Sequence, residues 1–166
     1  MDKLFFLLSG ENETLPAAEL NAILVSEGLS FKLTEKLDQT VRLECNLEGI
    51  QAVQSRAAYT MASALELFVC EANEEDIIEA VEDTDFAEVL SAGESFAVRI
   101  KRVKEYALHV STVPLEAKLG KYILGKVPQA KVNLKAPDKT FFGVLTSGKI
   151  VFGVKLAEIK PKTFSE

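Results

Sequence analysis

The spacing of apolar residues along the chain alternates between the two-residue period of strands and the longer period of helices. The run Leu4–Leu8 predicts a short buried strand. Leu20, Ile23 and Leu24 then form one helical stripe, and Gly28 marks where that helix ends. The pattern therefore predicts a protein that mixes strands and helices from its first residues onward.

The first six predicted elements follow the order strand, helix, strand, strand, helix, strand. They are the strands 4–8, 31–37, 41–45 and 59–69 and the helices 14–28 and 47–58. This order within about 70 residues is that of the ferredoxin-like split βαβ pattern. Thr14 is expected to cap the first helix, with Pro16 in its first turn. The acidic segment Glu71–Asp76 has no apolar anchor, which predicts a domain boundary near residue 72.

The remaining pattern predicts a second unit made of two helices, a strand, a third helix and three strands. Its helical patterns start near residues 77, 86 and 111, and its strands cover 95–103, 131–134, 140–146 and 149–159. In the first of these strands, Phe96 and Val98 point to the core, whereas Arg99 and Lys101 lie on the opposite face. The predicted fold class is α+β: an N-terminal ferredoxin-like domain over residues 1–72, followed by an α/β domain over residues 73–166.

Composition supports a packed interior and excludes several classes of protein. Of the 166 residues, 48% are apolar, which is enough for a hydrophobic core. The longest apolar run is too short to span a bilayer, and the N-terminus lacks the features of a signal peptide. We therefore expect a cytoplasmic protein with no membrane partner. Cys45 and Cys70 are too few for a disulfide framework or a zinc site, so we expect unreactive free thiols and no metal.

Charge is distributed unevenly along the chain. Residues 1–93 hold 5 Lys and Arg against 19 Asp and Glu, whereas residues 94–166 hold 14 against 6. The net charge of −6 therefore hides a basic second part. Such asymmetry favours a surface that binds a polyanion, because phosphate groups respond to charge within a Debye length of about 10 Å. The alternative is a solvated basic surface that has no ligand.

Basic residues of the second unit are spread over several predicted elements, an arrangement that suits a folded RNA read by its shape and phosphate positions. They are Arg99, Lys101, Arg102, Lys104, Lys118, Lys121, Lys126, Lys131, Lys135 and Lys139. Tyr106, Tyr122 and Phe141 lie among them and offer rings for base stacking, whereas the position of Phe142 in its strand favours the core. The acidic stretch 71–88 is expected to be a solvated face; the alternative is that it repels RNA and so orients it.

No group of residues in the sequence forms a catalytic centre. The stretch Gly143–Ile150 nearly matches a phosphate-binding P-loop, but Ile150 replaces the hydroxyl that would hold Mg²⁺. Its strand–turn–strand setting also lacks the helix that such a loop needs. His109 has Glu105 four residues before it but no nucleophile near it in sequence, so we expect a packed or surface imidazole. We assign no catalytic residue.

Several segments carry a resemblance to a known family. Ser95–Arg102 (SFAVRIKR), Leu119–Ile123 (LGKYI) and Val132–Asp138 (VNLKAPD), followed by a hydrophobic hairpin, resemble a THUMP domain. The opening Phe6–Leu20 and the segment Ser55–Thr60 are similar to the N-terminal part of the archaeal tRNA guanosine N2-methyltransferases. THUMP domains occur in tRNA-modifying enzymes beside a ferredoxin-like N-terminal domain, and the resemblance covers essentially the whole chain.

The resemblance implies a binding module that lacks its catalytic partner. Enzymes of this group add a C-terminal methyltransferase domain that uses S-adenosylmethionine, and this chain has neither the glycine-rich cofactor loop nor the Asp/Asn-Pro-Pro-Tyr motif of that domain. We therefore expect the parent protein to be a tRNA guanosine N2-methyltransferase, and expect neither a cofactor nor catalysis in this chain. It stops at Lys160–Glu166, where a linker would start, so we expect a piece of a longer protein; the alternative is a stand-alone adaptor.

In such enzymes the THUMP domain grips the tRNA acceptor end near its single-stranded 3′ terminus, which positions the tRNA for a catalytic domain in cis. Carried over to this sequence, the basic run and the resemblance imply RNA contacts by eight side chains. These are Arg99, Lys101, Arg102, Lys104, Lys118, Lys121, Lys135 and Lys139. Two alternatives stay open: the tRNA-binding part of another THUMP enzyme, such as a thiouridine synthase, and a ferredoxin-like interaction domain with no RNA role.

Overall fold

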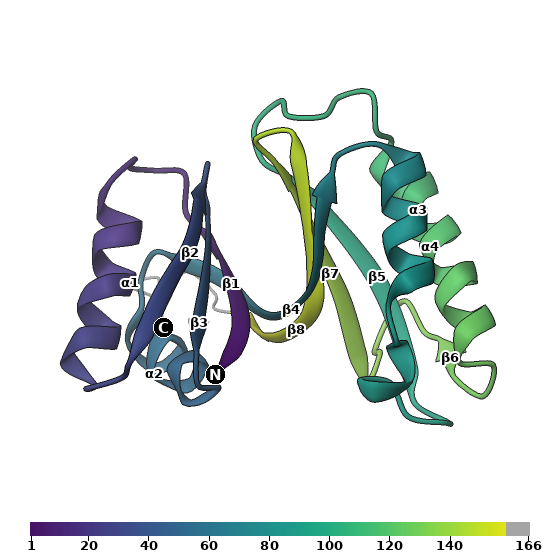
Figure 1. Ribbon diagram of the computed structural model, residues 1–166, viewed down its shortest axis with the longest axis horizontal. Helices are drawn as coiled ribbons and strands as arrows, with labels where there is room; N and C mark the ends of the chain where they lie inside the picture. The colour runs from purple at the N-terminus through teal and green to yellow at the C-terminus, as the bar shows by residue number, and fades with distance from the viewer. Residues whose placement is uncertain (159–166) are drawn as a thin grey trace. The chain divides into compact units, whose positions relative to one another are not determined.

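The computed structural model describes residues 1–158 and shows two compact units (Figure 1). The first unit is formed by Met1–Leu65 and takes in the end of the last strand from Lys155, and the second is formed by Glu66–Val154. The predicted boundary near residue 72 falls just after the end of the strand that the two units share. The predicted linker at 160–166, and residue 159 of the last predicted strand, lie outside the described residues.

The first unit has the predicted order of strands and helices. Its elements are β1 (Asp2–Leu8), α1 (Leu15–Ser26), β2 (Phe31–Leu37), β3 (Thr40–Cys45), α2 (Glu48–Arg56) and the first half of β4 (Thr60–Glu71). The strands are arranged in the order β2-β3-β1-β4, and each pairs antiparallel with its neighbour. A chain of this order, with its first strand between the third and the fourth, is ferredoxin-like, as predicted.

The core of the first unit lies between the sheet and its two helices. Leu4 and Phe6 of β1 pack in one cluster with Leu20 and Leu24 of α1, as the two apolar spacings require. Gly49 of α2 lies so close to β3 that a Cβ atom there would be 2.8 Å from the Sγ atom of Cys45. A side chain at this position would therefore separate α2 from the sheet.

The cap of α1 differs from the prediction. Thr14 stands before the helix, but its φ and ψ of −115° and −35° are already in the helical region, and its side chain makes no cap bond. The Oδ1 atom of Asn12 instead accepts hydrogen bonds from the backbone N–H groups of Thr14 and Leu15, at 2.9 and 3.0 Å. A capping side chain needs an extended backbone to reach the helix end, and Thr14 does not have one.

The second unit continues from the other half of β4 with helices and strands in the predicted order. Its elements are α3 (Glu74–Asp83), the 3₁₀ turn η1 (Phe86–Glu88), β5 (Ser95–Arg102), α4 (Thr112–Lys126), β6 (Lys131–Val132), β7 (Lys139–Thr146) and β8 (Lys149–Glu158). The strand order is β4-β8-β7-β5-β6. β5 pairs parallel with β6 and β7, and β7 forms the predicted antiparallel hairpin with β8. The P-loop-like stretch lies in this hairpin.

Two elements of the second unit are shorter than predicted. The second helix of the predicted pair is a single 3₁₀ turn, in which the side chain of Asp85 accepts from the backbone N–H of Ala87. The predicted strand 131–134 is only two residues long, because Asn133 Oδ1 accepts from the backbone N–H groups of Lys135 and Ala136. Side chains that bond to the nearby backbone compete with regular structure in both cases.

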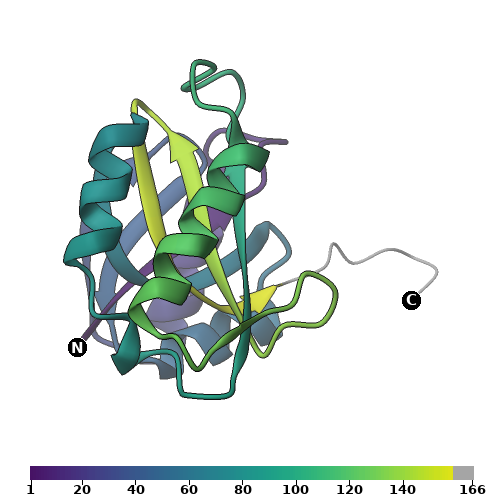
Figure 2. The ribbon, with the colours of Figure 1, turned by 90° about the vertical axis from the view of Figure 1, so that its right-hand side faces the viewer.

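The core of the second unit lies between its sheet and α3 and α4, which cover the same face of that sheet (Figures 1 and 2). Phe141 is fully buried there and contacts Phe86 edge-on, with ring centroids 5.2 Å apart. Phe142 is buried as well, as the strand pattern predicted. The suggestion that Phe141 stacks on a base is wrong, because its ring is enclosed by other aromatic rings.

Chemically reactive groups are few in the structure. Cys45 and Cys70 are free thiols, and burial raises the pKa of both, that of Cys70 to about 11. The ring of His109 makes a structural contact through its Nε2 atom, 2.8 Å from the carbonyl oxygen of Ala72. Within residues 1–158, no three metal-ligating side chains gather, and no helix has the length and apolar composition to cross a membrane.

Candidate nucleic-acid interface

Arg102 is turned toward the loop that follows its own strand. Its guanidinium group donates hydrogen bonds to the carbonyl oxygens of Tyr106, at 2.7 Å, and of Ala107 and Val110. Lys104 and Ala107 have the left-handed φ values of 48° and 54°, which cost energy for residues other than glycine. The sequence marked Arg102 as a phosphate contact, and the structure places it as the group that holds this strained loop together.

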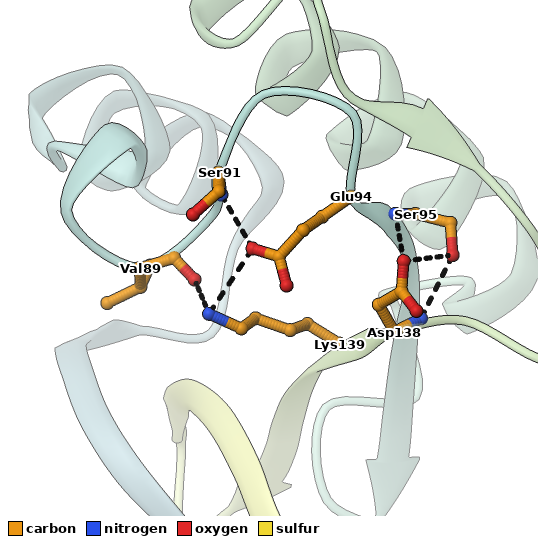
Figure 3. Close-up of polar contacts among 6 residues, drawn as sticks. All are labelled: Val89, Ser91, Glu94, Ser95, Asp138 and Lys139. Carbon is orange, nitrogen blue, oxygen red and sulfur yellow. Dashed lines mark hydrogen bonds and ion pairs between the residues drawn. The ribbon is translucent and has the colours of Figure 1, made fainter.

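Lys139 belongs to a clamp between two loops at the start of β5 (Figure 3). Its Nζ atom donates to the carbonyl oxygen of Val89 at 2.6 Å and lies 3.5 Å from Glu94 Oε1. The backbone N–H of Ser91 also donates to Glu94 Oε1, at 2.7 Å, and this bond, with the charge of Lys139, lowers the pKa of Glu94. The cation at position 139 is thus engaged within the protein.

The second half of the clamp joins Ser95 to Asp138 (Figure 3). Asp138 Oδ2 accepts from the backbone N–H of Ser95 at 2.8 Å and from its hydroxyl at 3.2 Å. The hydroxyl oxygen of Ser95 accepts in return from the backbone N–H of Asp138, at 2.9 Å. These reciprocal bonds fix the end of the 133–138 segment against the first residue of β5.

Two lysines of α4 reach across to the acidic helix α3. Lys118 forms an ion pair with Glu74, and the hydrogen bond of that pair raises the pKa of Lys118. Lys126 donates to the backbone carbonyl of Glu82 near the other end of α3. Part of the predicted positive charge on α4 is therefore balanced by the acidic stretch.

A wide shallow groove of about 850 Å³ runs along α4 and is lined by all three lysines of that helix. All the residues that line it come from α4: Pro114, Ala117, Lys118, Lys121, Tyr122, Gly125 and Lys126. Tyr122 is 37% exposed, so its ring is open to a ligand, as the sequence suggested. Lysines beside an exposed ring combine the two features that bind a single-stranded nucleic acid.

A second groove, of about 340 Å³, lies between α4 and the edge of the sheet where β6 ends. Its wall includes Val113, Val132 and Leu134, which are 71%, 50% and 62% exposed. Arg99 and Lys121 contribute cations to the same groove, and Lys121 also lines the first one. The sequence placed Val132 and Leu134 on a predicted strand but did not show that they form one exposed apolar wall with Val113.

At this edge of the sheet, two backbone groups that have no partner strand form hydrogen bonds with side chains. A guanidinium N–H of Arg99 donates to the carbonyl oxygen of Leu134 at 2.7 Å. Glu116 Oε2 accepts from the backbone N–H of Ile100 at 2.8 Å, a group left without a strand partner because β6 is so short. Three residues that line the groove, Arg99, Glu116 and Leu134, are thus held by bonds that do not depend on a ligand.

The predicted cations differ in whether the protein itself engages them. Arg99, Lys118 and Lys126 have the protein partners given above. Lys101, Lys121, Lys131 and Lys135 are exposed and make no side-chain hydrogen bond or ion pair with residues 1–158. Lys131 and Lys135 are the chain neighbours of Val132 and Leu134 in the apolar wall of the second groove, whereas Lys101 is on the opposite side of β5 from the core. Arg102 and Lys139 point into the protein, and Lys104 is exposed on the strained loop.

The family of the chain follows from its sequence and agrees with this architecture. The THUMP domain family matches residues 71–154, which correspond to the second unit almost residue for residue. The chain belongs to the THUMP domain family, which confirms the resemblance seen in the sequence.

Comparisons with individual proteins cover both units. The chain is 28% identical over 164 residues to the tRNA (guanine(10)-N2)-dimethyltransferase of Methanothermobacter thermautotrophicus, and the match covers 99% of this chain and 46% of that protein. The chain therefore spans about half the length of this curated relative.

Solved structures share the fold at lower identity. A possible methylase from Clostridium difficile 630 superposes with a TM-score of 0.71 at 12% identity, over 93% of this chain and 41% of that one. A 4-thiouridine synthetase in complex with RNA and ATP superposes with a TM-score of 0.62, also at 12% identity, over 96% of this chain and 42% of that one.

Proposed function

We propose that this chain is the tRNA-binding module of a tRNA methyltransferase and that it holds the acceptor end of the tRNA. The relative with 28% identity is a tRNA methyltransferase, and the fold is shared with a thiouridine synthetase that was solved with RNA. The proposal also includes a catalytic domain in cis, carried by the part of the parent protein that lies beyond this chain. S-adenosylmethionine would bind in that domain.

The observation that carries the proposal is the shared edge of the two grooves. Lys121 lines both, so a phosphate near its Nζ atom would face the lysine row of α4 on one side and Arg99 on the other. Lys131 and Lys135 extend this positive edge along the β6 segment. Unpaired nucleotides have apolar base faces and charged phosphates, and the exposed wall of Val132 and Leu134 next to these cations matches both.

Titration of a labelled tRNA at two salt concentrations tests the proposal. We expect binding at about 50 mM salt that weakens steeply toward 200 mM, because each phosphate contact releases counterions. A tRNA whose 3′ end has been trimmed should bind more weakly than the intact molecule. If the chain does not bind tRNA at low salt, the proposed function fails.

Two alternatives give different outcomes. A module of a thiouridine synthase would bind tRNA in the same way, and the sequence that follows this chain in its parent protein would distinguish the two. A ferredoxin-like domain that binds a protein or a small molecule would show interactions that salt hardly affects. Charge reversal at Lys118 and Lys121 would leave the binding by such a domain unchanged, whereas it should weaken the binding of tRNA.

A further inference from the structure

The segment 133–138 carries Leu134, which lines the second groove, and next to it Lys135, yet it lies outside regular structure. Both side chains are exposed, and that of Lys135 has no polar partner within residues 1–158. An irregular exposed segment usually moves, and a moving lysine binds phosphate weakly because its ordering costs entropy. In the segment 133–138, however, hydrogen bonds to the backbone restrict such movement.

Asn133 holds the segment from within. Its Oδ1 atom accepts hydrogen bonds from the backbone N–H groups of Lys135 and Ala136, both at 3.1 Å. Its Nδ2 atom donates to the carbonyl oxygen of Ala136 at 3.3 Å, and its own backbone N–H donates to the carbonyl oxygen of Phe96 at 2.9 Å. One side chain thus fixes the turn, while the backbone of the same residue fixes the turn to β5.

Two further contacts fix the segment from outside. Arg99 donates to the carbonyl oxygen of Leu134 at 2.7 Å, and the reciprocal bonds between Ser95 and Asp138 hold its end (Figure 3). The backbone is therefore tied at its start, middle and end, whereas the side chain of Lys135 is left free. Bonds of this kind hold the backbone in place before a ligand arrives.

We propose that Asn133 is a positioning residue for RNA binding: it orders the 133–138 segment in advance, so that Lys135 and Leu134 meet the RNA without a large loss of entropy. The inference rests on the proposed function and names a residue that carries no charge and need not touch the RNA. Arg99 assists through its bond to Leu134, in addition to lining the groove. The affinity for tRNA should then depend on Asn133, although replacing this residue by another neutral residue leaves the charge of the protein unchanged.

The test compares Asn133→Ala with a matched control, Gln129→Ala, in the full chain. Gln129 is an exposed neutral amide four residues earlier, and its side chain makes no hydrogen bond with residues 1–158. We expect Asn133→Ala to weaken tRNA binding about tenfold, which equals about 1.4 kcal/mol, and Gln129→Ala to leave it unchanged. Asn133→Ser, whose hydroxyl can replace part of the turn, should give an intermediate affinity.

A second measurement reports the order of the segment without RNA. Trypsin cleavage after Lys135, followed by mass spectrometry, should be faster in Asn133→Ala than in the wild type or in Gln129→Ala, with equal melting temperatures for all three. If Asn133→Ala is cut faster but binds tRNA as tightly as the wild type, order in this segment does not matter and the inference is overturned. Equal cleavage would overturn it as well, because Asn133 would not order the segment. If the wild type itself does not bind tRNA, the proposed function has failed, and the inference with it.

Discussion

Gly49 is the position at which a single methyl group should have the clearest effect on stability. Its ideal Cβ position lies 2.8 Å from Cys45 Sγ and 3.3 Å from Leu24 Cδ2, and both side chains are fully buried. Optimal contacts between non-bonded heavy atoms are about 3.5–4.0 Å long, so α2 must move or Cys45 must change its rotamer. The variant Gly49→Ala therefore overpacks the junction between α2 and β3.

The magnitude follows from two opposing effects. Overpacking a well-packed core costs about 1–3 kcal/mol, whereas alanine is favoured over glycine inside a helix by about 1 kcal/mol. Because the contact of 2.8 Å is so short, we take the overpacking cost from the upper part of its range, at about 2–3 kcal/mol. After the helix gain of about 1 kcal/mol is subtracted, Gly49→Ala should lower the free energy of unfolding by about 1–2 kcal/mol. For a chain of this length, such a loss corresponds to a fall of about 3–6 °C in the melting temperature.

Urea denaturation followed by circular dichroism measures the change. The control is the double variant Gly49→Ala with Cys45→Ala, in which loss of the sulfur makes room for the new methyl group. We expect the double variant to be more stable than the sum of the two single changes predicts, by about 1 kcal/mol. Wild-type stability in Gly49→Ala, or strict additivity of the two changes, would refute the close approach of α2 to Cys45.

Two further predictions concern charge and thiol chemistry. Glu74→Gln releases Lys118 from its ion pair and should raise the affinity for tRNA about two- to threefold at low salt. The control Glu88→Gln removes an unpaired carboxylate of the same acidic stretch and should raise the affinity less. Equal effects of the two variants would show that the pairing of Lys118 is irrelevant to binding. Burial, reinforced by nearby carboxylates, raises the pKa of Cys70 to about 11, so the thiol stays neutral at pH 8. Its alkylation by iodoacetamide at pH 8 should therefore be roughly a hundredfold slower than that of an exposed cysteine, and the rate should show an inflection near pH 11. Alkylation at the rate of an exposed thiol would contradict the burial of Cys70.

Hydrophobic spacing was sufficient to predict most of the fold. Strands such as β1 and helices such as α4 are held by long apolar faces, and the period of those faces is visible in the sequence. The elements that differ are short. Their ends are set by single side chains, Asp85 at η1 and Asn133 after β6, which bond to backbone groups two or three residues away. Periodicity carries no information about such bonds.

The candidate site was predictable only as a group of cations. The sequence identified the basic residues but not their partners, because those partners come together only when the chain folds. Lys139 bonds to Val89, which lies 50 positions away, and Lys118 pairs with Glu74, which lies 44 away. The apolar wall of the second groove was missed for the same reason, since its residues come from α4, from β6 and from the segment after β6.

RNA is proposed to contact Lys121, which lines both grooves, and Lys135, the chain neighbour of Leu134. The most direct test is the slope of tRNA affinity against salt for the double variant Lys121→Gln with Lys135→Gln, compared with Lys32→Gln on β2 of the first unit. Each lost phosphate contact reduces the slope of log K against log salt by about 0.7–0.9, so the double variant should lose about 1.4–1.8 from its slope while Lys32→Gln loses nothing. Equal slopes for the wild type and the double variant would place the RNA elsewhere on the protein.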